Sequence, residues 1–282
     1  MATKLDVTTG YADVNGVRLY FENAGQGESV VFVHAGIADR RLWNHQFPVV
    51  ARDYMALRYD MRGYGHSSLQ NGAFSHTRDL WALLSVLGIR SAVLVGCSIG
   101  GSVCMDFALS YPKMVRGLVM VCSMPRGLPW DEAVQAAYPD PPQAEEVEAA
   151  IKAGDLERAS ELEVQVFVDG LSRQPEDVDP AVRGLVYDMN LIALRNEAAA
   201  RDASHSYLHQ DAADQLESLT VPTLVITGAL DEPVTTDYAA NAMVERIPNV
   251  QKVVIDNTAH VPSLERPDEF NRALLDWLKT LE

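Results

Sequence analysis

The sequence predicts an α/β protein with a mostly parallel, doubly wound sheet of eight strands, an N-terminal antiparallel hairpin and an inserted helical cap. Short apolar runs rich in β-branched residues alternate with helical patterns along most of the 282 residues, as in sheets buried on both faces. One central stretch, from about Arg126 to Asp214, breaks this alternation with proline-rich turns and amphipathic helical windows and shows no convincing series of strands.

The sheet is expected to begin with a hairpin over Tyr11 to Glu22, because Asn15-Gly16 is a dipeptide favoured in type I′ turns. Six further strands are expected at short apolar runs. These are Val30 to Val33, Met55 to Tyr59, Ala92 to Val95, Val115 to Val121, Thr223 to Thr227 and Lys252 to Ile255.

Helical periodicity between the strands predicts the covering helices. They are expected at Leu80 to Leu87, Ser102 to Tyr111, Tyr238 to Arg246 and Pro267 to Leu281, and inside the central stretch at Ala144 to Val166 and Pro180 to Arg201. Pro112 supplies a stop for the second of these, because the residue before a proline disfavours the α region. We therefore expect one core domain formed by residues 1–125 and 212–282, with residues 126–211 as a cap.

The charge balance argues against nucleic acid and anionic lipid as partners. The 23 lysines and arginines stand against 39 acidic residues, a formal net charge of -16 that repels phosphate backbones at long range. Screening by salt confines this field to the surroundings of each charge, so the net charge does not exclude an anionic substrate in a pocket.

The location expected from the sequence is the cytoplasm. The three cysteines, Cys97, Cys104 and Cys122, lie in apolar contexts without metal-ligand spacing and are expected to be buried, reduced thiols. Met1 to Gly10 has no apolar core of a signal peptide, and no apolar run reaches the length of a membrane span. Neither monomer nor homodimer is favoured.

The most informative segment is an apolar strand followed by Gly96-Cys97-Ser98-Ile99-Gly100 and a helix. This is the context of a nucleophile elbow, in which a strained positive-φ turn lifts the serine hydroxyl clear of the backbone and the glycines leave room. The helix N-terminus behind the serine favours negative charge, as an oxyanion requires. Alone, the glycines would mark only a tight turn between strand and helix.

A serine nucleophile needs a base that a third group orients. Of the seven histidines, only His260 follows a late buried strand within a short loop, and Asp231 follows the preceding strand. The carboxyl ends of parallel strands open on one edge of a sheet, so both residues are expected to face Ser98. Glu232 and Asp256 are the rivals of Asp231. Glu232 leaves the turn in another direction, and Asp256 is expected to belong to its strand.

An oxyanion hole needs two N–H donors, one after the nucleophile and one from an earlier loop. Ile99 supplies the first, and Gly36 in His34-Ala35-Gly36-Ile37 is our choice for the second. His34 is expected to brace this loop by hydrogen bonding rather than to react.

In these motifs the chain resembles the α/β-hydrolase superfamily, and within it the esterase and lactonase branch that includes 3-oxoadipate enol-lactonases. The resemblance covers roughly residues 12–125 and 212–281. Its further matching pieces are Asp60-Met-Arg62-Gly63-Tyr-Gly65-His-Ser67, Gly228-Ala-Leu-Asp231 and His260-Val-Pro-Ser-Leu-Glu-Arg-Pro. It implies an α/β-hydrolase fold in which Ser98, Asp231 and His260 carry catalysis and Gly36 and Ile99 donate to the oxyanion. One departure is Ala35, where the family usually has glycine.

The expected activity is hydrolysis of a small-molecule carboxylic ester or lactone through an acyl-enzyme. Alternatives on the same triad are a carbon–carbon bond hydrolase and a perhydrolase or acyltransferase, and an alternative of another class is a non-catalytic small-molecule receptor. No metal or other cofactor is expected, because neither a Walker sequence, an HExxH motif nor a cysteine cluster is present and the glycines after Asp60 lack the third glycine of a dinucleotide fingerprint.

The cap is expected to close the pocket and set its specificity. Met124, Trp130, Phe167 and Met189 are the candidate lining residues, although core packing is the favoured interpretation of each. A substrate that carries a carboxylate would need a cation, for which Arg126 and Arg183 are the candidates.

Overall fold

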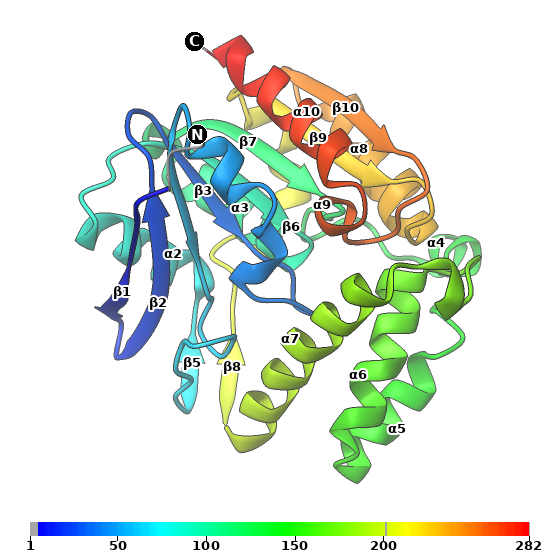
Figure 1. The fold of residues 1–282 in the computed structure, drawn as a ribbon. Helices are drawn as coiled ribbons and strands as arrows, with labels where there is room; N and C mark the ends of the chain where they lie inside the picture. The colour runs from blue at the N-terminus through cyan, green and yellow to red at the C-terminus, as the bar shows by residue number, and fades with distance from the viewer. Residues whose placement is uncertain (1–4, 201, 282) are drawn as a thin grey trace.

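A computed structural model describes residues 5–200 and 202–281 of the chain. Part of the segment Met1 to Gly10 and the last residue of the helical window that ends at Arg201 therefore lie outside the described residues. The main sheet has eight strands in the order β1-β2-β4-β3-β6-β7-β9-β10 (Figure 1). The strands are β1 (Val7–Val14), β2 (Val17–Ala24), β3 (Ser29–Val33), β4 (Met55–Tyr59), β6 (Ala92–Cys97), β7 (Val115–Val121), β9 (Thr223–Gly228) and β10 (Val250–Ile255).

The predicted sheet and its N-terminal hairpin are confirmed. Strands β1 and β2 pair antiparallel and are joined by Asn15 and Gly16, both with positive φ, as a type I′ turn requires. Strand β2 pairs antiparallel with β4, and every later pairing in this sheet is parallel. All carboxyl ends from β3 onward therefore open on one edge.

Helices cover both faces of the sheet. The core helices are α1 (Phe47–Val50), α2 (His76–Val86), α3 (Ile99–Ser110), α8 (Ala240–Arg246), α9 (Pro262–Glu265) and α10 (Pro267–Leu278). Short 3₁₀ or π turns complete the chain: η1 (Arg40–Trp43), η2 (Pro112–Met114), η3 (Gln165–Asp169), η4 (Pro175–Asp177), η5 (Ala212–Ser218), η6 (Val234–Ala239) and η7 (Lys279–Leu281).

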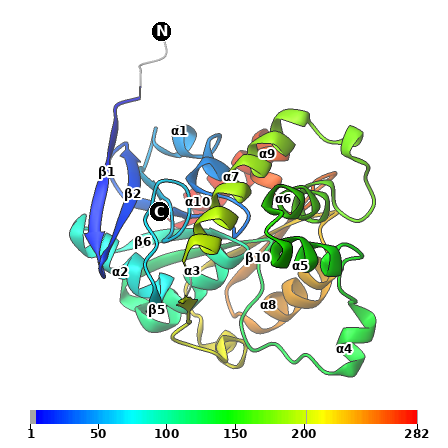
Figure 2. The same ribbon diagram turned by 90° about the horizontal axis from the view of Figure 1, so that it is seen from below.

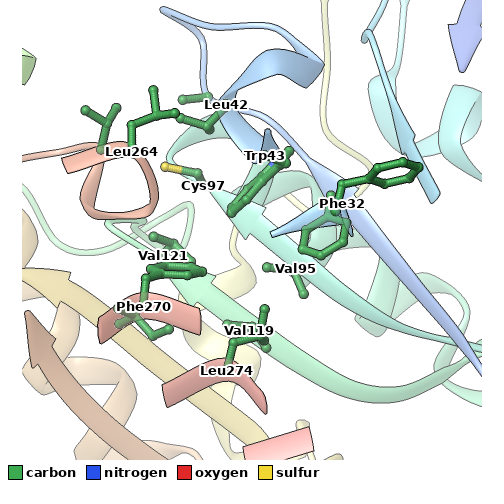
Figure 3. Packing of buried hydrophobic residues seen from close by; sticks show 14 of the residues in the cluster. Phe32, Leu42, Trp43, Val95, Cys97, Val119, Val121, Leu264, Phe270 and Leu274 are labelled. Carbon is green, nitrogen blue, oxygen red and sulfur yellow. The ribbon is translucent and has the colours of Figure 1, made fainter. Parts of the chain in front are cut away.

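The alternation of side chains along each strand divides the core into two hydrophobic clusters, one on each face. On β6, Val95 and Cys97 belong to the cluster that packs against α1, α9 and α10, which Figure 3 shows with Trp43 and Phe270. Leu94 belongs to the other cluster, under α2, α3 and α8. Burial on both faces explains why the parallel strands read as continuous apolar runs.

A helical insertion separates β7 from β9. It contains α4 (Glu132–Ala137), α5 (Ala144–Ala153), α6 (Leu156–Val164) and α7 (Pro180–Ala199), which lie together beside the edge where the strands end (Figures 1 and 2). The single helical window expected over Ala144 to Val166 is divided, because Gly154 adopts a left-handed conformation and Asp155 caps the next helix.

Two three-residue strands were not anticipated. Strand β8 (Ala203–His205) lies inside the stretch in which no strand series was expected, and it pairs in parallel with β5 (Gly72–Phe74) in a separate two-stranded sheet. Both strands are too short and too polar to show a hydrophobic period. Their pairing connects the end of the insertion to the core.

The remaining features of the core follow its sequence. The three cysteines are free and buried. Asp60 is fully buried and accepts hydrogen bonds from the backbone N–H groups of Arg40 and His66, so the segment after β4 is a structural turn. Among the described residues, no helix combines the length and hydropathy needed to cross a membrane.

Candidate active site

Ser98 lies in a strained turn between β6 and α3, with φ 54° and ψ -122°. Its N–H donates to the Val121 carbonyl at 2.9 Å, and its carbonyl accepts from the Ser123 hydroxyl at 2.7 Å, so both flanks of the turn are fixed. A Cβ atom on Gly96 would overlap the backbone of Gly100, which explains why this turn requires glycine. Strained non-glycine residues of this kind occur mainly at functional sites.

His260 and Asp231 form a buried pair at the ends of β10 and β9. The Nδ1 atom of His260 lies 3.0 Å from both carboxylate oxygens of Asp231, and both side chains are nearly inaccessible. Asp231 also accepts the N–H of Glu232 at 2.9 Å, which fixes the carboxylate. Because Nδ1 donates to the carboxylate, Nε2 is left as the free acceptor of the neutral imidazole.

The rivals of Asp231 lie elsewhere. Glu232 is half-buried and contributes its backbone N–H to Asp231, whereas its side chain lines a neighbouring cavity. Asp256 is exposed, and β10 ends one residue before it, so it is outside the strand to which the sequence assigned it. Burial lowers the pKa of His260, but the negative charge and hydrogen bond of Asp231 outweigh burial, so that the net pKa is raised above the usual 6.5.

The insertion holds the histidine loop in place. The backbone N–H of His260 donates to the carbonyl of Phe167 at 3.0 Å, and the two rings lie 5.0 Å apart. Within the loop, the N–H of Ala259 donates to the Glu265 carboxylate at 2.7 Å, and Arg173 of the insertion pairs with that carboxylate at 2.7 Å. Residues of the insertion therefore determine where the imidazole lies.

Two cavities meet at Ser98 and His260. The first, of about 360 Å³, is lined by Gly36, Ile99, Ser98 and His260 on the core side and by residues of the insertion opposite. The second, of about 390 Å³, shares Ser98, Ile99, Phe167 and His260. The further residues of the first cavity that matter below are Arg62, Tyr64, Phe74, His76, Glu163, Asn190, Glu197 and His205.

Gly36 and Ile99 lie next to each other at this junction. A Cβ atom on Gly36 would lie 3.6 Å from the Ile99 side chain and 3.8 Å from the Tyr64 hydroxyl, which is ordinary contact. Among the described residues, neither backbone N–H has a hydrogen-bond acceptor, so both are free to donate to a ligand. His34 braces the loop as the sequence predicts: its Nε2 accepts the Met61 N–H at 2.9 Å and its Nδ1 lies 2.8 Å from the Ala35 carbonyl.

The four candidate lining residues are divided by the structure. Phe167 lines both cavities, and Met124 and Trp130 line the second with exposed fractions of 37% and 48%. Met189 lines neither cavity: it is fully buried in the core, where its sulfur accepts the Asp39 N–H at 3.4 Å. The hydrophobic pattern of a helix does not reveal whether its apolar face meets a core or a cavity.

The two candidate cations also differ. Arg126 lies in the wall of the second cavity, with its guanidinium 5.1 Å from the centre of the Tyr207 ring. Arg183 pairs with Asp169 and Glu161 inside the insertion, at 2.7 and 2.8 Å, and lines neither cavity. Arg126 is therefore the candidate that faces the site.

Sequence reasoning missed the polar lining of the first cavity, above all Tyr64, His76, Glu163 and His205. One signal in the sequence could have indicated this polar lining: Asn190 is a polar residue between buried apolar neighbours on α7. Among the described residues, one group has metal-ligand geometry: atoms of Cys122, Asp231 and His260 lie within 4.8 Å of one another. Burial raises the pKa of the Cys122 thiol, and the other two groups already bind each other, so this group fits a metal ion poorly.

The fold and this arrangement of residues define the class of protein. The chain belongs to the α/β hydrolase fold family, whose model matches residues 28–267. The pimeloyl-acyl-carrier-protein methyl ester esterase of Aeromonas hydrophila is 27% identical over 255 residues, covering 88% of this chain and 94% of the esterase. A non-heme chloroperoxidase of Kitasatospora aureofaciens is 26% identical over 273 residues, covering 94% and 97% of the two chains.

A solved structure shows the same fold. The enol-lactonase of Burkholderia xenovorans has a TM-score of 0.77 and 21% identity, and the match covers 96% of this chain and 100% of that chain. At this identity the likeness shows a common fold. The match of the family model confirms the resemblance to the α/β-hydrolase superfamily that was expected from the sequence.

Proposed function

We propose that this protein is a serine hydrolase that cleaves a carboxylic ester or lactone, with Ser98 as nucleophile, His260 as general base and Asp231 as the acid that orients it. The observation that carries the proposal is the His260–Asp231 pair, with Nδ1 3.0 Å from both carboxylate oxygens, in the wall of the cavity that Ser98 also lines. The family, and the names of the esterase and the enol-lactonase to which the chain is similar, agree with this chemistry.

The proposed reaction proceeds in two steps. The Ser98 hydroxyl attacks the carbonyl carbon and its proton passes to Nε2 of His260, while the N–H groups of Gly36 and Ile99 stabilise the oxyanion. The imidazolium, stabilised by Asp231, then gives the proton to the leaving oxygen, and an acyl-enzyme remains. His260 then takes a proton from water, which attacks the acyl carbon, and gives this proton to the Ser98 oxygen as the bond to the acyl group breaks and the acid leaves.

The test compares Ser98→Ala with Ser85→Ala, which removes an exposed hydroxyl on α2 that bonds only to its own helix. With p-nitrophenyl acetate and a panel of lactones, we expect Ser98→Ala to lose about 10³-fold to 10⁶-fold in kcat and Ser85→Ala to retain wild-type rates. A fluorophosphonate should label the wild type and Ser85→Ala at Ser98. Activity and labelling that survive in Ser98→Ala would exclude this serine as the nucleophile.

Product analysis separates the alternatives on the same residues. Peracid formation from an ester and hydrogen peroxide would identify a perhydrolase, an activity class suggested by the chloroperoxidase relative. Cleavage of a vinylogous diketone without ester turnover would identify a carbon–carbon bond hydrolase. Thermal stabilisation by small esters without turnover of any of them would identify a receptor.

A further inference from the structure

The first cavity, which Ser98 lines, also has acidic residues in its wall. Glu163 of α6 and Glu197 of α7 both line it, and among the described residues neither carboxylate has a lysine, arginine or histidine nitrogen within 4 Å. Asn190 donates to Glu163 from α7 at 2.6 Å, so the Glu163 carboxylate is held in a defined position. The Asn196 side chain donates to the Gly63 carbonyl at 2.9 Å and holds α7 against the core.

The cations that the structure describes near this wall do not neutralise it. Arg62 also lines the cavity, but its guanidinium pairs with both carboxylate oxygens of Asp79, at 2.7 and 2.9 Å. Burial lowers the pKa of His76 well below its usual value and that of His205 to about 4, so both rings are neutral near pH 7. The charge of His260, when protonated, is balanced by Asp231.

Burial raises the pKa of Glu163; the hydrogen bond from Asn190 opposes this effect and the negative charge of Glu197, which lines the same cavity, adds to it. Tyr64 lines the same cavity, where burial raises the pKa of its phenol and the negative charge of Glu197 adds to this effect. Phe74 and Phe167 add ring surface to the cavity. Carboxylates combined with aromatic rings form a favourable environment for an organic cation.

A second observation, independent of the acids, also points to a ligand in this cavity. His76 lines the same cavity and is 3% exposed, and its Nδ1 atom has no hydrogen-bond partner among the described residues. The ring is fixed by Phe74 and His205, whose ring centres lie 5.0 and 4.5 Å from its own. A buried polar atom without a partner costs free energy that a bound donor would recover.

We propose that the first cavity binds the protonated amine of an amine-bearing ester or lactone, with Glu163 and Glu197 as its counter-charges and His76 as a further polar partner. This inference rests on the proposed function, because it assigns the part of the substrate that does not react. The formal net charge of -16 favours the same class, since an acidic protein raises the local concentration of cations.

The test uses acetate esters whose alcohol part carries a dimethylamino group two, three or four carbons from the ester oxygen. Each is paired with the hydrocarbon of the same shape, so that 2-(dimethylamino)ethyl acetate is compared with 3-methylbutyl acetate at a pH where the amine is protonated. The measured quantity is the ratio of kcat/KM within a pair. Because the ammonium also activates the ester chemically, the ratio is compared between protein variants, where that effect cancels.

In the wild type we expect the best pair to favour the amine ester. Glu163→Gln combined with Glu197→Gln should lower the ratio about tenfold, because only the kcat/KM of the amine ester should fall. Glu145→Gln is the matched control, because it removes an exposed acid from α5, outside both cavities. An equal ratio in wild type, double variant and control overturns the proposal. A parallel fall in Glu145→Gln overturns it as well, since that result would show a general field effect.

A binding measurement separates this proposal from the proposed function. In Ser98→Ala, dimethylethanolammonium should raise the melting temperature and 3-methylbutanol should not, and the difference should vanish when the two glutamates are also replaced by glutamine. Binding of the amine without turnover in the wild type would retain the amine site and contradict the hydrolase. Turnover dependent on Ser98, without selective binding of the amine, would retain the hydrolase and overturn the amine site.

Discussion

The imidazole of His34 connects the ends of two neighbouring strands, because its Nε2 accepts the Met61 N–H at 2.9 Å while its Nδ1 contacts the Ala35 carbonyl at 2.8 Å. An acceptor at Nε2 requires the neutral ring, and burial keeps the pKa of His34 below its usual value. The loop that contains Gly36 is therefore held by a histidine that does not itself line the first cavity.

Replacement of His34 by alanine should separate this bracing role from a direct catalytic one. The Met61 N–H, fully buried, would lose its acceptor, and we expect unfolding to become easier by about 1–3 kcal/mol, as measured by urea denaturation. We also expect kcat to fall more than KM changes, because Gly36 would be less well positioned. His45→Ala, an exposed change, is the control. A folded His34→Ala enzyme with wild-type kcat would contradict this role.

Asp231→Asn should lower activity and also move its pH profile. In the proposed mechanism the active base is neutral His260, so kcat/KM should rise with pH through a pKa above 6.5, the direction in which Asp231 shifts it. In Asp231→Asn we expect a loss of about 10⁴ in kcat and a rising limb at lower pH. A greater loss in Glu232→Gln than in Asp231→Asn would assign the orienting role to Glu232 and contradict this prediction.

The glycines of the elbow should be intolerant of even one added carbon. Alanine at Gly96 would meet the backbone of Gly100, and alanine at Gly100 would meet the backbone at Val33 and His34, none of which is a flexible side chain. We expect each variant to fold poorly or to lose more than about 3 kcal/mol of stability. Gly184→Ala, at an exposed position of α7, meets nothing within 4 Å and should gain about 0.5–1 kcal/mol. Thermal denaturation of the three variants distinguishes these outcomes, and equal stability of all three would contradict the steric explanation.

Acid should destabilise the fold in part through His205. Burial lowers its pKa to about 4 from 6.5, so between these values the folded protein binds fewer protons than the unfolded chain. The free energy of unfolding should therefore fall as pH drops through this window, and His205→Gln should make the fall shallower. Urea titrations at several pH values between 7 and 4 measure the slope, with His45→Gln as control. An unchanged slope in His205→Gln would show that this ring is not a source of acid sensitivity.

The sheet and the elbow could be predicted from the sequence because the interactions that determine them are local. A run such as Val115–Val121 is buried on both faces and reads as a strand without knowledge of its neighbours, and Ser98 is flanked by glycines that its turn requires. The pairing of His260 with Asp231 follows from the common edge of a parallel sheet, so it too could be anticipated.

The lining of the first cavity could not be anticipated in the same way. Glu163 and Asn190 meet across two helices, and His76 and His205 meet through the pairing of β5 with β8, a contact between segments more than a hundred residues apart. Whether Met189 lies in the core or lines the cavity could not be decided from the sequence either, because tertiary packing determines the orientation of α7. Periodicity describes one helix at a time and contains no information about such contacts.

The hydrogen bond from the His260 N–H to the Phe167 carbonyl has a consequence for redesign. An exchange of the insertion between relatives to alter selectivity would also exchange this acceptor of the His260 backbone N–H. A graft that shapes a new pocket but misplaces that single carbonyl would leave the histidine unsupported, and substrate recognition and chemical competence would be lost together. In this molecule a segment exchanged without that loss would have to leave in place both the turn Gln165–Asp169 and Arg173, which holds the histidine loop through Glu265.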